Sequence, residues 1–238
     1  MDYSKLFLLK KEVGTYFFET YKTLANVMGA DDSIDEKGWF IYSGYDACIA
    51  YLAFKDPDFV DDLKDEKKAK RIVNSIIMES YHYRLKMEPL APEYVDKAKS
   101  YLDDIVNNGF KPKKARIYFN SKIVLFPKFK SVHKEEVAHE AGHALYDMQG
   151  KSLDEMTRRF DHELFATFSS DYMLRKDGFK LSDIIDVDKQ DDLAKILWKV
   201  YSMAERQFDD FLGFVNHVRE FFHGRKSFED CFNQKTFN

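Results

Sequence analysis

The chain has 238 residues, of which 45% are hydrophobic and 33% charged, so it can bury a sizeable core and does not resemble a disordered protein. Its net charge of −4 gives no global attraction to nucleic acid or to anionic membranes. The two cysteines, Cys48 and Cys231, form neither a disulfide framework nor a Cys-x-x-Cys metal pattern. Because no apolar run is long enough for a signal sequence or a membrane span, we expect a cytoplasmic protein that binds neither nucleic acid nor membrane.

The first half of the sequence predicts helices. Residues 4–28 carry apolar side chains at helical spacing, with Ser4 as a candidate cap and Gly29 as the stop. Further helices are expected at 45–54, from Asp56-Pro57 to about Lys86, and from Pro92 to Asn107-Asn108-Gly109. We therefore expect residues 1–110 to form a helical N-terminal part.

The character of the sequence changes at residues 115–126, which read ARIYFNSKIVLF. Their β-branched and aromatic residues predict a β-hairpin or a pair of short strands, ended by Pro127. The next helix is expected to begin at Ser131 and to end at Gly150.

Two more helices are expected after Gly150. The first begins at a capping box formed by Ser152 and Glu155 and runs to about Leu174. The second is one long amphipathic helix over residues 189–223. The predicted fold is α+β and mainly helical, with a small β-sheet before the helix at 131–150. Residues 111–238 form its second part, and both parts are expected in one compact unit.

The helix predicted at 131–150 contains the motif His-Glu-Ala-Gly-His at positions 139–143. Residues four apart lie on one face of a helix, so the imidazoles of His139 and His143 can meet one ion. Glu140 can then act as a base toward a water bound to that ion. The alternative is a pair of satisfied histidines on a buried helix. Gly142, in the middle of this helix, indicates close approach of a neighbouring helix or strand.

A catalytic zinc site needs a third protein ligand and an open position. Glu163 is the favoured third ligand because it lies on the next predicted helix, among apolar side chains, where its charge needs a partner. Asp161 and His162 are the fallback ligands, and His162 can instead support the site from behind the ligands. Without a metal, Arg158 or Arg159 would be the partner of Glu163.

The pair of motifs, His139-Glu140-x-x-His143 followed about 20 residues later by Glu163, resembles the gluzincin branch of zinc metallopeptidases. The segment HEAGHALYDMQG is also similar to the carboxypeptidase Taq and oligopeptidase families, and the compact length is similar to ImmA/IrrE-type peptidases. The resemblance covers residues 115–175. It implies a zincin-like fold with His139, His143 and Glu163 as zinc ligands and Glu140 as base. At Thr167 the chain departs from the thermolysin-like enzymes, which carry there an Asp that orients the first histidine.

The predicted function is therefore zinc-dependent hydrolysis of peptide bonds, by attack of a zinc-bound water with Glu140 as general base. The substrate, a peptide or protein, is expected to lie extended along the edge of the strand before the zinc helix. One alternative is a non-catalytic zinc-binding regulatory or interaction protein of the same fold. Another is a helical binding module in which the histidine pair is incidental. The candidates for stabilising an oxyanion are Tyr172, Tyr201, Arg206 and His217.

Overall fold

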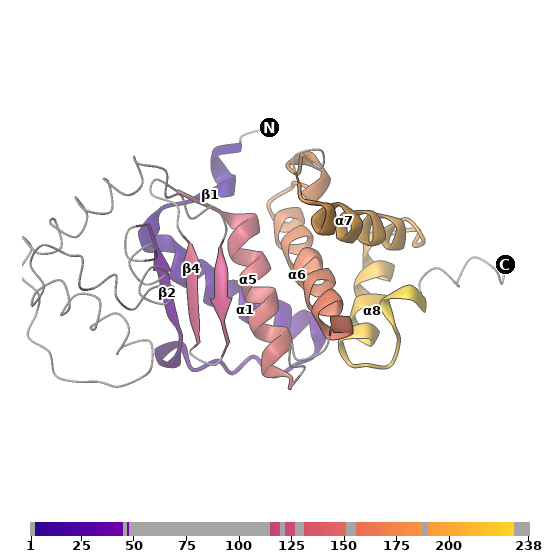
Figure 1. Cartoon of the computed structure of the whole chain (residues 1–238), viewed down its shortest axis with the longest axis horizontal. Helices are drawn as coiled ribbons and strands as arrows, with labels where there is room; N and C mark the ends of the chain where they lie inside the picture. The colour runs from indigo at the N-terminus through magenta and orange to yellow at the C-terminus, as the bar shows by residue number, and fades with distance from the viewer. Residues whose placement is uncertain are drawn as a thin grey trace, which may run out of the picture. The chain divides into compact units, whose positions relative to one another are not determined.

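The computed structural model describes residues 3–44, 47, 115–119, 122–126, 131–150, 156–186 and 190–230. This part of the chain is mainly helical and contains a small β-sheet, as predicted (Figure 1). By contacts, the chain divides into two compact units. The first comprises Met1–Leu6, Thr15–Ile34 and His133–Asn238, and the second comprises Phe7–Gly14 and Asp35–Val132. The helices predicted between 45 and 109 lie outside the described residues except at Ala47, and the boundary predicted near residue 110 stays a prediction.

Helix α1 (Lys10–Met28) begins later than predicted. Tyr3–Leu6 forms the 3-10 helix η1 and Phe7–Leu8 forms strand β1, which pairs with strand β5 (Val132–His133). The prediction that Ser4 caps the helix was therefore wrong, because strand pairing intervenes between Ser4 and the helix. Instead, the Leu9 amide donates to the carboxylate of Glu12 in the first helical turn, at 2.8 Å. The predicted stop at Gly29 is confirmed by its φ of 67°.

The larger sheet has three strands in the order β2-β4-β3. Strands β3 (Arg116–Tyr118) and β4 (Ile123–Phe126) are antiparallel, which confirms the hairpin predicted at 115–126. Strand β2 (Phe40–Ser43) pairs with β4 in parallel and was not predicted. All four residues of β4 are buried. The expectation that a substrate lies extended along the strand before the zinc helix stays a prediction.

Helix α5 (Lys134–Met148) carries the His-Glu-x-x-His motif. It begins after His133, whose Nδ1 accepts the Glu135 amide at 3.2 Å. The prediction of a cap at Ser131 was wrong because residues 132–133 form β5. The end of the helix is as predicted, with Gly150 at a φ of 73°.

Helix α6 (Met156–Lys176) lies beside α5 (Figure 1). The capping box predicted at residues 152–155 lies outside the described residues. A short 3-10 helix, η4 (Leu181–Asp183), follows α6.

The long helix predicted at 189–223 is in fact two helices, α7 (Asp192–Glu205) and α8 (Phe211–Phe222). The carboxylate of Asp210 accepts the Gly213 amide at 2.7 Å and so begins a new helix. Phe208, in the connection, packs against Phe214 with ring centroids 5.6 Å apart. A polar cap and an inward-facing aromatic residue thus interrupt the periodic pattern. Gly224 ends α8 at a φ of 70°.

The core of the first unit is rich in aromatic rings. Within α1 the predicted stripe of apolar side chains is buried, including Phe17, Tyr21 and Met28, whereas Leu9, which precedes the helix, is 54% exposed. Phe165 and Phe168 of α6 and Phe222 of α8 are also fully buried. None of the described helices is both long and apolar enough to cross a membrane.

Candidate metal centre

Helix α5 places His139 and His143 on one face, one turn apart. Their Nε2 atoms are 3.1 Å apart, and the two rings meet edge to face with centroids 4.7 Å apart. The opposite faces of the helix are fixed by packing, since Val137, Ala141 and Ala144 are fully buried. The histidine pair is therefore presented by a rigid element rather than by a loop.

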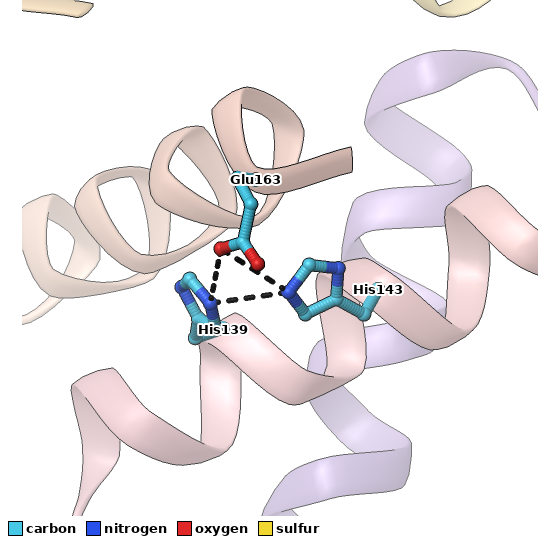
Figure 2. Close-up of side chains that lie close together, drawn as sticks. All are labelled: His139, His143 and Glu163. Atoms are coloured by element: carbon cyan, nitrogen blue, oxygen red, sulfur yellow. Dashed lines mark hydrogen bonds and ion pairs between the residues drawn. The ribbon is translucent and has the colours of Figure 1, made fainter. Parts of the chain in front are cut away.

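Glu163 of α6 points at both histidines (Figure 2). Its Oε2 lies 3.3 Å from Nε2 of His139 and 3.6 Å from Nε2 of His143. The structure thus brings together the three residues that the sequence predicted as ligands, and this group can hold a metal ion.

The three donor atoms have the spacing of a tetrahedral site. Zinc bonds of about 2.0–2.2 Å at tetrahedral angles place neighbouring donors about 3.3–3.5 Å apart. The observed separations of 3.1, 3.3 and 3.6 Å bracket that value. A circle through the three atoms has a radius of about 1.9 Å, so a single ion could be held by all three at normal bond lengths.

The two helices approach closely at Gly142, as the mid-helix glycine indicated. A Cβ at this position would lie 2.4 Å from Oγ of Ser169, 2.7 Å from its Cβ and 3.1 Å from Cα of Ala166. The hydroxyl of Ser170 also donates across the interface to the carbonyl of Glu135, at 3.1 Å. The sequence signal for the α6 side of this contact is its row of small residues, Ala166, Ser169 and Ser170. Close packing sets the distance from Glu163 to the histidines.

The charges in the group favour an ion pair when no metal is bound. Burial disfavours the charged form of His139, but the hydrogen bond to Glu163 and nearby carboxylates outweigh it and raise the pKa of His139 to about 9. Burial opposes ionisation of Glu163 too, yet its hydrogen bonds to His139 and His143 hold its pKa well below the usual range. Burial lowers the pKa of His143 to about 4, so its imidazole is neutral near pH 7.

Glu140, the predicted base, is buried beside this group, with 6% of its surface exposed. Burial is the main cause that raises the pKa of its carboxyl group to about 7, and the carboxylates of Glu163, Glu135 and Glu136 add to the effect. A carboxyl group with this pKa can take up and release a proton near neutral pH.

The two fallback ligands do not belong to the donor group. His162 lies behind His143, with the Nδ1 atoms of the two rings 3.2 Å apart. Asp161 is half-buried on α6 and is not part of the group. The hydroxyl of Thr167 donates to the carbonyl of Glu163 at 2.8 Å, within its own helix. The side chains of Arg158 and Arg159 lie outside the described residues.

Three of the four candidates for oxyanion stabilisation have roles in the helical core. The buried hydroxyl of Tyr201 donates to Asp171 at 2.9 Å. Tyr172 packs on the ring of Phe211, with centroids 6.3 Å apart. His217 is buried against Phe208 at 5.3 Å. The fourth candidate, Arg206, is the exposed C-cap of α7.

Comparison with known proteins found no relative of this chain. No protein family, curated protein or solved structure matches the chain.

Proposed function

We propose that this chain is a zinc-dependent metallopeptidase with a zincin-like arrangement of its catalytic helices. The observation that carries the proposal is the triangle of His139, His143 and Glu163 donor atoms, with the buried carboxyl of Glu140 on the same helix. Two imidazoles and one carboxylate form the ligand set of known catalytic zinc sites, which keep a fourth position open.

The donor chemistry supports zinc among the metals. Imidazole nitrogens suit zinc, copper, iron and nickel, whereas calcium and magnesium prefer a shell of oxygen ligands. The tetrahedral spacing then favours zinc over the square-planar geometry of copper(II) and nickel(II). When bound, zinc supplies Lewis acidity, which polarises a carbonyl and lowers the pKa of water at the site to about 7.

The role of Glu140 in this proposal is to move one proton. Its carboxylate accepts a proton from the attacking water as the new C–O bond forms at the scissile carbonyl carbon. The same carboxyl then donates that proton to the leaving amine nitrogen as the C–N bond breaks. A pKa of about 7 suits both steps at neutral pH.

The group is open to a substrate on one side. The side chains of His139 and Glu163 are 26% and 28% exposed, whereas that of His143 is 8% exposed. A peptide carbonyl can therefore approach the donor atoms from the side of His139 and Glu163, while His143 and Glu140 stay enclosed.

The variant Glu140→Gln tests the proposal because it keeps the volume and removes the base. We expect it to retain one zinc per chain and to cleave an unstructured peptide library about 10²–10⁴-fold more slowly than the wild type, as read by mass spectrometry. Glu220→Gln on α8, where the glutamate pairs with Arg225 at the surface, is the matched control and should cleave normally. Equal cleavage by Glu140→Gln with zinc retained contradicts the assignment of the base. Zinc binding without cleavage of any peptide by the wild type supports the non-catalytic alternative instead.

A further inference from the structure

His162 is a fully buried histidine whose ring lies against a proposed ligand. Its Nδ1 is 3.2 Å from Nδ1 of His143, and the two rings lie within 26° of parallel. The distance is that of a nitrogen–nitrogen hydrogen bond, in which one ring must donate and the other accept.

The proposed metal centre decides which ring donates. His143 directs Nε2 at the donor triangle, so that nitrogen must carry a lone pair to bind an ion. The proton of a neutral His143 is then on Nδ1, and it faces His162. Nδ1 of His162 must therefore be the acceptor, and a neutral His162 carries its own proton on Nε2.

We infer that His162 is a positioning residue, which accepts the Nδ1–H of His143 and so fixes the tautomer and the direction of its Nε2 lone pair. The inference rests on the proposed function and deepens it. His162 and Glu163 are consecutive on α6, so one helix contacts both ring nitrogens of His143. Histidines that bind metals commonly donate their second N–H to such an acceptor.

The ring of His162 is itself held in place. Tyr146 of α5 meets it edge to face, with centroids 4.7 Å apart at 76°. Tyr146 packs in turn on Phe165 at 5.3 Å and on Phe222 at 5.9 Å. A ring enclosed in this way cannot turn Nδ1 away from His143 without displacing the core. Because the acceptor on His162 is fixed in place, it can fix the orientation of the His143 ring.

Two variants separate the hydrogen bond from the packing. His162→Phe keeps an aromatic ring and removes the acceptor. His162→Asn keeps an acceptor, because its Oδ1 lies close to the position of the histidine Nδ1. The matched control is His217→Phe, which replaces another buried histidine that packs on Phe208 and Phe228.

Zinc affinity, measured by competition with a chromophoric chelator, is the first readout. We expect His162→Phe to bind zinc about 10–100-fold more weakly than the wild type, His162→Asn to recover most of the loss, and His217→Phe to match the wild type. The visible spectrum of the cobalt(II)-substituted protein should shift in His162→Phe and not in His217→Phe. Equal affinity and equal spectra in wild type and His162→Phe overturn the inference but leave the zinc site in place.

A second measurement needs no variant. In the zinc-loaded wild type with labelled histidine, NMR should show one slowly exchanging ring proton on Nδ1 of His143, with a coupling across the hydrogen bond to Nδ1 of His162. A proton on Nδ1 of His162, or no such coupling, overturns the inference. A wild type that binds zinc and shows the coupling but cleaves no peptide supports the inference and refutes the peptidase. A wild type that binds no zinc overturns both.

Discussion

Gly142 is the position at which the site depends most directly on helix packing. In Gly142→Ala the new methyl group would lie 2.7 Å from Cβ of Ser169 and 3.1 Å from Cα of Ala166. Normal carbon–carbon contacts are about 3.5–4.0 Å. Rotation of the Ser169 side chain cannot relieve contacts with Cβ and with backbone, so α5 and α6 must separate by about 1 Å.

Separation of the two helices should reduce the stability of the protein slightly and its zinc affinity more strongly. Overpacking costs about 1–3 kcal/mol, and alanine returns about 1 kcal/mol of helix propensity, so the net loss of stability is about 0–2 kcal/mol. That lowers Tm by only a few degrees. The distances of 3.3 and 3.6 Å from Oε2 of Glu163 to Nε2 of His139 and of His143 would each grow by about the same amount as the helix separation. Metal bonds tolerate only about ±0.2 Å, so zinc affinity should fall at least about tenfold.

The assay is zinc titration against a chelator, with thermal unfolding of the metal-free protein alongside. Gly14→Ala on α1 is the matched control, because a Cβ there meets no atom within 4 Å. It should raise stability by about 1 kcal/mol and leave zinc affinity unchanged. The double variant Gly142→Ala/Ser169→Gly removes the closest contacts and should recover part of the affinity. If Gly142→Ala binds zinc like the wild type and is stabilised like Gly14→Ala, the close packing at this position does not set the geometry of the site.

Two further predictions concern protons and stability. At pH 7.5 the metal-free His139 is protonated, since its pKa is raised to about 9, so zinc uptake should release at least about one proton and should weaken as the pH falls. Calorimetry in buffers of different ionisation enthalpy measures that number, and a release of none contradicts the ion pair between His139 and Glu163. The variant Asp171→Asn removes a buried carboxylate that accepts a hydrogen bond from the hydroxyl of Tyr201 and pairs with Arg175. Urea denaturation should therefore show that the free energy of unfolding falls by about 3 kcal/mol. The folded variant should keep its zinc, and unchanged stability would show that this network contributes nothing.

The candidate site could be anticipated from the sequence because its geometry is local. Four-residue spacing on one helix fixes the relation of His139 to His143 whatever surrounds them. Glu163 could be placed opposite the histidines by assuming only that the next helix, α6, packs alongside α5. The close approach at Gly142 was anticipated as well, since a glycine in a helix interior signals a crowded neighbour.

The features that were missed depend on partners distant in sequence. Strand β2 has a place only because β4 lies beside it, and β1 only because β5 does. The break between α7 and α8 depends on the Asp210 cap and on Phe208 turning inward, which a periodic pattern does not record. The hydrogen bond from Tyr201 to Asp171 was missed for the same reason, because Asp171 lies 30 residues away on another helix.

We propose that three side chains, those of His139, His143 and Glu163, hold one zinc ion. Elemental analysis of protein purified without affinity tags or added metal tests it most directly, with His139→Ala, His143→Ala and Glu163→Ala beside the wild type. We expect one zinc per chain in the wild type and its loss in each variant, while His217→Phe keeps it. No metal in the wild type even after zinc is offered, or equal metal in all the variants, would show that these three side chains do not form a zinc site.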